Sequence, residues 1–259
     1  MQLNLSIMQN NIHLPCVSST LTYLKEKVEE QLQVGQFLPA YFTITADKQE
    51  QGRGRKGKIW ESESGENVLL SVLLYPNVTP SQQFNVCRMV SLSLIRLLEQ
   101  TFGLNNVSIK WPNDIYIRDK KIVGILIEHS IQGEQIKYTI AGIGLNVNQA
   151  KFPSTLPNPT SIFLETGEKS GVFSCAEGII DKLKQMESVS VMDLEKQYND
   201  CLYLRDTYAE FILPKISDKP MLLKIMEVNR IGLLQLSDKE NRLFSCAFDE
   251  IIYLHTRRI

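Results

Sequence analysis

The chain has 259 residues, of which 43% are apolar, and its 28 Lys and Arg against 29 Asp and Glu give a net charge of −1. This length suits one large core with a small additional domain, and the balanced charge disfavours a dedicated nucleic-acid binder, which is usually basic. Five scattered cysteines without C-x-x-C spacing, an N-terminus without a basic leader and no run of about 18 apolar residues predict a soluble, cytoplasmic protein with reduced thiols.

The first hundred residues predict helices and strands in alternation. Hydroxyl side chains at 18–20 offer N-cap oxygens before a helical stripe that begins at Leu21. The run NVLLSVLLY is nearly all apolar and has strand length, so we expect a buried strand. In chain order, the expected elements are an extended lead-in over 1–15, a helix from Leu21 to Leu32, strands over 39–46 and 67–75, and a helix from Pro80 to about Phe102.

A β-rich block follows, and its short turns predict an antiparallel meander. The expected strands are 107–111, 115–117, 122–131 and 136–147, the last two forming a hairpin around Gly133. Helical patterns then cover 161–164 and 173–204, with a weak point at 188–190. Short alternating strands near 222–225, 232–236, 242–246 and 251–253 predict a small SH3-like barrel. We therefore expect an α+β fold in two domains, 1–210 and 211–259.

The stretch GRGRKGKIW at 52–60 concentrates glycines and cations and ends in Trp60. Glycines give access to positive φ and let backbone amides approach an anion, and a Trp ring offers a stacking surface. The spacing does not fit the phosphate loop G-x-x-x-x-G-K-[ST], and the polar segment after Trp60 does not fit a dinucleotide fingerprint. A solvated basic loop, or one that contacts RNA, is the alternative.

Other polar stretches interrupt the strands. Lys110-Trp111-Pro112-Asn113-Asp114 places a cation, an amide and a carboxylate around a turn, although a local Asx turn is the simpler explanation. Lys121 stands at a strand start with Gly124 after it, where a solvated edge lysine is the alternative. GIGLNVN at 142–148 brings Asn146 into a glycine-interrupted strand, which a β-bulge would also explain. Together these stretches suit a nucleotide site.

In their order and spacing, GRGRKGKIW, KWPNDIYI at 110–117, KIVGILIE at 121–128 and GIGLNVN resemble the biotin protein ligase family. The resemblance implies a catalytic domain of the class II synthetase-like, biotin/lipoate ligase type, with a mixed, mostly antiparallel sheet packed with helices and an SH3-like C-terminal module. It implies an enzyme that activates biotin with ATP and Mg²⁺ as biotinyl-5′-AMP. The activated biotin then passes to one lysine of an apo biotin carboxyl carrier protein of acetyl-CoA carboxylase or a related enzyme. The partners so implied exclude DNA and membranes and include a possible homodimer.

The resemblance also implies site residues. Lys121 and Arg55 are the expected catalytic residues, and Asp114 is the expected Mg²⁺ ligand. The expected biotin contacts are Ser19, Thr20, Gln49, Gly52, Arg53, Gly54, Arg55, Lys121 and Gly124. The expected ATP contacts are Arg53, Arg55, Trp60, Lys110, Asn113, Asp114 and Asn146.

The sequence departs from the family pattern at Leu21, where a polar Asn is expected after Ser-Thr. The short lead-in leaves no helix-turn-helix, so a repressor function is not expected. A lipoate or octanoate ligase or transferase of the same fold is the alternative, but its R-R-x-x-G-G-G run is missing. We also expect the basic loop to be mobile when empty and to close over the ligands as a lid, because few apolar side chains anchor it.

Overall fold

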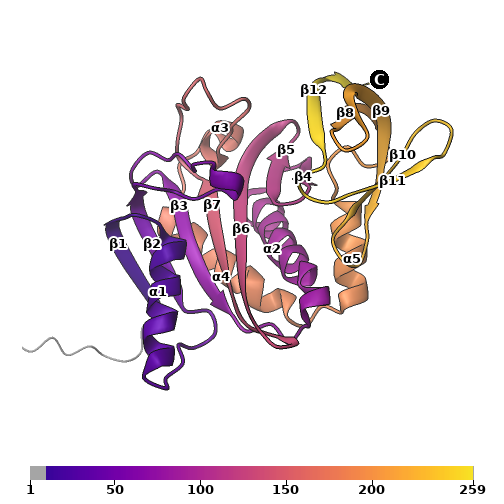
Figure 1. Cartoon of the computed structure of the whole chain (residues 1–259). Coiled ribbons are helices and arrows are strands. Elements are labelled where there is room, and N and C mark those ends of the chain that lie inside the picture. Colours follow the sequence, from indigo (N-terminus) through magenta and orange to yellow (C-terminus); the bar gives the residue numbers. More distant parts are fainter. Residues whose placement is uncertain (1–9, 259) are drawn as a thin grey trace, which may run out of the picture.

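A computed structural model describes residues 10–258 and contains two β-sheets with helices packed around the larger one (Figure 1). The larger sheet has seven strands in the order β1-β2-β3-β7-β6-β5-β4. Only β1 and β2 run parallel; the other neighbours are antiparallel. Its strands are β1 (Asn11–Val17), β2 (Thr43–Gln49), β3 (Asn67–Leu74), β4 (Val107–Lys110), β5 (Asp114–Ile117), β6 (Lys120–Gln132) and β7 (Gln135–Asn146).

One face of this sheet is covered by α1 (Thr20–Gln33), which lies in front of it in Figure 1. Ser19 caps the helix by accepting a hydrogen bond from the Thr22 amide, as the hydroxyl cluster predicts. Leu21, Leu24 and Val28 are buried and pack with side chains from β2, β3 and β7. The N-terminus of α1 is thereby fixed against the middle of the sheet.

The opposite face carries the main core, formed with α2 (Phe84–Phe102), α4 (Val172–Met186) and α5 (Val191–Asp200). Because both faces are covered, every residue of β3 is buried, which explains its nearly continuous apolar sequence. Two 3-10 turns, η1 (Arg55–Gly57) and η2 (Pro80–Gln82), and the short helix α3 (Ile162–Thr166) complete the larger unit.

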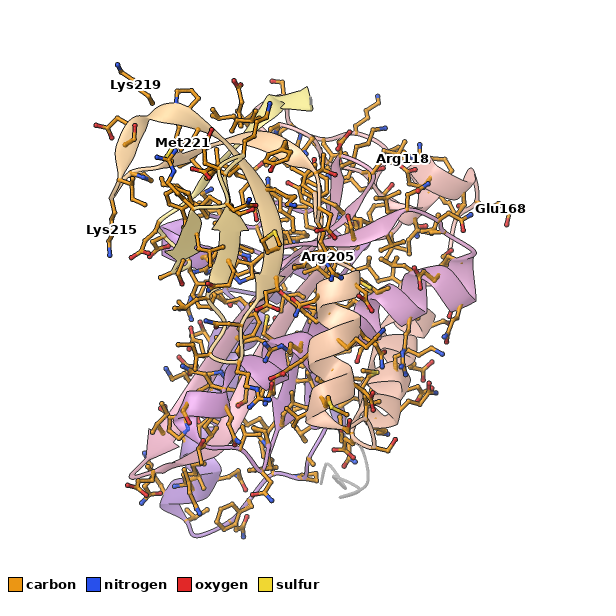
Figure 2. The ribbon with its side chains drawn as sticks, turned by 90° about the vertical axis from the view of Figure 1, so that its right-hand side faces the viewer. Arg118, Glu168, Arg205, Lys215, Lys219 and Met221 are labelled. Carbon is orange, nitrogen blue, oxygen red and sulfur yellow. The ribbon has the colours of Figure 1, made fainter. Side chains whose placement is uncertain are left out.

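The second sheet is antiparallel, with strand order β11-β10-β9-β8-β12. Its strands are β8 (Tyr208–Leu213), β9 (Ser217–Val228), β10 (Leu234–Ser237), β11 (Leu243–Cys246) and β12 (Ile252–Arg258). The turn between β8 and β9, with Lys215, and the start of β9, with Lys219, project from the body of the molecule (Figure 2).

Buried polar contacts hold the second sheet on the first unit. The Arg88 guanidinium, fully buried in α2, donates to the Asn229 carbonyl at 2.7 Å and to the Val228 carbonyl at 3.4 Å. The Trp111 indole donates to the Gly232 carbonyl at 3.1 Å. These bonds satisfy carbonyls of the turn after β9, so the second sheet has a defined position relative to the first.

The expected α+β class, the antiparallel meander and a C-terminal β domain are confirmed. Several details differ from the prediction. The strand expected over 39–46 begins only at Thr43, the helix from Pro80 starts as a separate 3-10 turn, and the pattern over 173–204 forms two helices. The expected barrel strands do not include β8, and the predicted domain boundary at 210/211 falls within it; that boundary stays a prediction.

The extended lead-in is present as β1, which continues past Pro15 to Val17, whereas residues 1–9 lie outside the described part. Within residues 10–258, none of the helices has both the length and the apolar character needed to cross a bilayer.

Candidate functional site

A pocket of about 620 Å³ opens between the basic loop, the middle of the large sheet and the second sheet. This size falls within the usual range for small-molecule sites. Almost all expected site residues line it: Ser19, Thr20, Gln49, Arg53, Gly54, Arg55, Trp60, Lys110, Asn113, Asp114, Lys121, Gly124 and Asn146. Gly52 is the exception. It lies at the base of the loop, where an added Cβ would stand 2.4 Å from the Trp60 carbonyl oxygen.

One part of the pocket wall is a buried cluster of polar side chains. The Thr20 hydroxyl lies 2.8 Å from the Ser71 hydroxyl and 3.0 Å from Gln49 Oε1, which also accepts from the Thr20 amide at 2.8 Å. Ser19, Thr20 and Ser71 are almost inaccessible to solvent. Leu21, the departure from the family pattern, is also buried and lines the same pocket, 3.1 Å from a Cβ added to Gly142. This wall offers both hydrogen bonds and apolar contact to a ligand.

Trp60 lies inside the pocket against two glycines that face each other across β6 and β7. A Cβ added to Gly124 would stand 2.6 Å from the indole, and one added to Gly144 would stand 2.4 Å from it. These glycines therefore make room for the ring, and the pairing of β6 with β7 is regular here rather than bulged. The Trp60 Nε1 atom is buried and has no hydrogen-bond partner among the described residues, a condition that usually costs about 1–3 kcal/mol.

Lys121 and Asp114 form an ion pair at the centre of the pocket, with 2.8 Å between Lys121 Nζ and Asp114 Oδ1. The lysine also lies over the Trp60 ring, 5.5 Å from its centroid. Its backbone is fixed from both sides, because its amide donates to the Asn158 carbonyl and its carbonyl accepts from the Thr160 amide. Lys121 is thus a positioned cation within the site and not a freely solvated edge residue.

Two asparagines hold the backbone around this pair. The Asn113 side chain donates to the Ile125 carbonyl at 2.8 Å, so it bridges to β6 rather than closing a local Asx turn. Asn146 is buried, and its side chain donates to the Thr160 carbonyl at 2.8 Å. In both cases the amide nitrogen is engaged, which leaves the amide oxygen as the group that each asparagine can offer to a ligand.

Lys110 extends from the end of β4 between two tyrosines of different sheets. Its Nζ atom lies 4.9 Å from the Tyr116 ring centroid, 4.8 Å from that of Tyr253, and 3.1 Å from the Tyr116 hydroxyl. Burial lowers the pKa of Lys110 to about 8, although the nearby carboxylate of Asp114 works in the opposite direction. Burial also raises the pKa of the Tyr116 hydroxyl to about 12. Lys110 therefore loses its charge around pH 8, well below the usual range for a lysine.

The two arginines of the basic loop are both engaged with carboxylates. Arg53 Nη2 lies 2.7 Å from a Glu128 oxygen, and Arg55 Nη2 lies 3.8 Å from Asp249 Oδ1. The Arg55 guanidinium also stands over the Phe248 ring, 4.7 Å from its centroid. These side chains are part-exposed, so each ion pair is weak and can be exchanged for a stronger anion.

The basic loop itself is folded back in a short antiparallel turn. Its backbone amides at Gly54 and Trp60 donate to the carbonyls of Lys58 and Gly52. Within this loop, only Gly57 has a positive φ, at 72°. Gly54 is required for a different reason, because a Cβ added there would lie 3.0 Å from the Lys58 carbonyl oxygen. Closure of this loop as a lid stays a prediction.

No group of three or more His, Cys, Asp or Glu side chains is positioned to hold a metal within the described residues. Asp114, the expected Mg²⁺ ligand, lines the pocket and forms an ion pair with Lys121. Cys87, Cys175, Cys201 and Cys246 have thiol pKa values that burial raises to about 11, so these thiols are poor nucleophiles.

Sequence reasoning missed several residues in the pocket and also Glu128, which lies beside it as the partner of Arg53. Ser71 was detectable, because a serine interrupts the apolar strand 67–74 at a fully buried position. Glu128 was also detectable, because it is a charged residue at the end of the otherwise largely apolar stretch KIVGILIE. Phe248 and Asp249 come from the turn between β11 and β12 and carried no local signal, because only tertiary packing brings them to Arg55.

Comparisons with known proteins agree with this arrangement. A sequence model of the "Biotin/lipoate A/B protein ligase family" matches residues 13–146, which is about half of the chain and includes the four motifs almost completely. The bifunctional ligase/repressor BirA of Bacillus subtilis is 34% identical over 160 residues, covering 61% of this chain and 46% of that protein. The biotin–[acetyl-CoA-carboxylase] ligase of Paracoccus denitrificans is 31% identical over 144 residues, covering 53% of this chain and 59% of that protein. The chain thus spans only about half the length of these relatives.

The fold is shared with solved structures along nearly the whole chain. A biotin protein ligase from Aquifex aeolicus, solved in complex with biotin and ATP, superimposes with a TM-score of 0.70 at 24% identity, covering 97% of this chain and 100% of that one. At this identity the likeness establishes the fold, which extends through the second sheet.

Proposed function

Because the chain belongs to the biotin/lipoate A/B protein ligase family, we propose that it is an ATP-dependent ligase that activates biotin as biotinyl-5′-AMP and transfers it to a lysine of a biotin carboxyl carrier protein. The observation that carries this proposal is a pocket whose buried hydroxyl and amide wall stands in the same cavity as Lys121 and the two loop arginines. The relative from Paracoccus denitrificans is a biotin ligase by name, and one related structure holds biotin and ATP.

The polar and the apolar parts of the pocket wall each suit a different part of biotin. Its ureido group presents hydrogen-bond donors and an acceptor, which complement the hydroxyls of Thr20 and Ser71 and the Gln49 amide. Its apolar chain suits the walls formed by residues such as Leu70 and Ile143, and its carboxylate suits the cations of the basic loop. The lipoyl dithiolane has no comparable polar groups and would leave this wall unpaired, which favours biotin over lipoate or octanoate.

In the first step, an oxygen of the biotin carboxylate attacks the α-phosphorus of ATP, and the bond to the leaving pyrophosphate breaks. Carboxylate and polyphosphate repel each other, so the chemistry depends on cations placed between them. We assign this role to Lys121, fixed by its backbone bonds, and to Arg53 and Arg55, which exchange their present carboxylate partners for the substrates. Trp60 is assigned to adenine stacking, and Lys110, Asn113 and Asn146 to the triphosphate.

In the second step, the neutral ε-amine of the carrier lysine attacks the acyl carbon of the mixed anhydride. An amide forms, AMP leaves, and the amine loses a proton. No enzyme-bound covalent intermediate is required, in keeping with the raised pKa values of the four buried cysteines. The enzyme's contribution is positioning and charge neutralisation.

Mg²⁺ would enter together with the triphosphate, whose charge it neutralises. The residues fit such an ion in the way usual for nucleotide sites, where one or two carboxylates supplement phosphate and water ligands. Asp114, which lines the pocket beside Lys121, would supply the carboxylate, and the amide oxygens of Asn113 and Asn146 could orient the surrounding water. A dedicated cage of protein ligands is absent from the described residues.

The decisive experiment supplies purified protein with ATP, Mg²⁺ and biotin, and measures pyrophosphate release and labelling of an apo-carrier domain. We expect both signals with biotin and neither with lipoate. Labelling with lipoate but not with biotin would instead establish the alternative function.

The role of Lys121 is tested in the same assay. Lys121→Ala should reduce adenylate formation by roughly 100-fold or more, the usual effect of removing a preorganised charge from a reaction centre. Lys120→Ala is a matched control, because this neighbouring lysine is exposed and points to Glu165, outside the pocket. Equal losses in both variants would remove the assignment.

A further inference from the structure

The turn between β11 and β12 is built to keep a fixed shape. The Glu250 amide donates to the Ala247 carbonyl at 3.0 Å, and the Ala247 amide donates to the Glu250 carboxylate at 2.9 Å. Lys215, from the turn between β8 and β9, forms an ion pair with the same carboxylate. Phe248 and Asp249 lie between these anchoring residues, so the turn holds them toward the pocket that they line.

Phe248 is also fixed by the core of the larger unit. Its ring centroid lies 5.2 Å from that of Trp111 and 6.2 Å from that of Phe84, at tilted angles that suit aromatic contacts. Trp111 is buried and is itself bonded to Gly232 of the second sheet. The position of the Phe248 ring therefore follows from the way the second sheet sits on the first.

These two side chains meet Arg55, which comes from a distant part of the sequence. The Arg55 guanidinium lies 4.7 Å from the Phe248 ring centroid, and its Nη2 atom lies 3.8 Å from Asp249 Oδ1. The guanidinium carbon lies over this ring, and such a contact uses none of the N–H groups, which can therefore donate hydrogen bonds to other partners. The carboxylate occupies one of the directions from which a phosphate oxygen would approach.

We propose that Phe248 and Asp249 are positioning residues for Arg55: Phe248 holds the guanidinium at the pocket, and Asp249 is a place-holding anion that the triphosphate of ATP displaces. This inference rests on the proposed function and assigns part of the nucleotide site to the second sheet.

The charges decide the direction of each effect. The Asp249 side chain is 56% exposed, so its single charge is well solvated and binds Arg55 weakly. The triphosphate carries several negative charges and replaces it, but every binding event must first break the Arg55–Asp249 pair. Removing the carboxylate therefore favours ATP, whereas removing the aromatic ring disfavours it by letting Arg55 move.

The test compares Asp249→Asn, Phe248→Leu and the control Asp218→Asn, which removes the same charge from an exposed site on β9 outside the pocket. At low ionic strength, Asp249→Asn should lower the KM for ATP by roughly two- to fivefold. Phe248→Leu should raise it by a similar factor of roughly two to five. The gain in Asp249→Asn should disappear in about 1 M salt, where the screening length is about 3 Å. The control variant should leave kcat and both KM values unchanged.

An unchanged or raised KM for ATP in Asp249→Asn overturns the proposal. A second readout does not depend on ligase activity. In the ligand-free protein, both pocket variants should be cleaved by trypsin after Arg55 faster than wild type, because the guanidinium has lost a contact. Unchanged cleavage overturns the restraint of Arg55 by this turn. Wild-type protein that consumes no ATP would refute the proposed function, and the trypsin comparison would still decide whether the turn restrains Arg55.

Discussion

Lys110 provides a quantitative prediction about pH. Its pKa is lowered from 10.5 to about 8, chiefly because burial penalises its charge. Between pH 8 and 10.5 the unfolded chain therefore holds a proton that the folded chain has released, and stability due to this group rises with pH. At about 1.4 kcal/mol per pH unit, the whole window corresponds to about 3 kcal/mol. Below pH 8 the folded protein bears the full penalty.

The assay is urea unfolding of wild type and Lys110→Met at about pH 7, 8, 9 and 10.5, which spans both pKa values. Other groups titrate in this range, so the informative quantity is the difference between the two proteins. The unfolding free energy of wild type should rise by about 3 kcal/mol relative to the Met variant across the series. Lys110→Arg, which stays charged, should show no such rise. Parallel curves for wild type and Lys110→Met would refute the reasoning.

Two further predictions concern packing. Gly144→Ala should expel Trp60 from the pocket, because the new Cβ would stand 2.4 Å from the indole. The chain has only two tryptophans and Trp111 is buried, so the tryptophan fluorescence emission should shift to the red. The KM for ATP should rise roughly tenfold, because the stacking of adenine on Trp60 is lost. Gly171→Ala, at the N-cap of α4, is the control, and an unshifted spectrum in Gly144→Ala would contradict the prediction. Arg88→Met should lower the unfolding free energy by about 3 kcal/mol or more, because two charge-assisted bonds of 2.7 Å, to Asn85 and Asn229, are lost. Urea unfolding measures this effect, Arg88→Lys should be intermediate, and a loss below about 1 kcal/mol would show that Arg88 does not anchor the second sheet.

Local sequence determined the elements whose signals are short-range. The Ser-Thr cap set the start of α1, and the apolar run 67–74 could only be a strand covered on both faces. The order of strands in the meander followed from its short turns. Where the signal depended on packing, prediction was weaker: β8 was missed, and Tyr41 and Phe42, aromatic residues typical of strands, lie just before β2.

The residues of the site were likewise predictable only where the signal is local. The four motifs contain every Lys and Arg that lines the pocket and two of its four side-chain amides, because each motif is a short contiguous stretch that local reading can detect. Their chemical partners were not predictable: the pairing of Arg53 with Glu128, of Lys121 with Asp114 and of Arg55 with Asp249 depends on how strands and turns pack.

The sequence by itself thus determined the fold class, the strand meander and the residue types at the pocket, since these depend on hydrophobic periodicity, turn chemistry and contiguous motifs. Only the tertiary structure decided that Trp60 fills the space above Gly124 and Gly144. It alone decided that Phe248 and Asp249, far from Arg55 in the chain, complete the basic loop. Such contacts depend on the docking of one sheet on another, which no local pattern encodes.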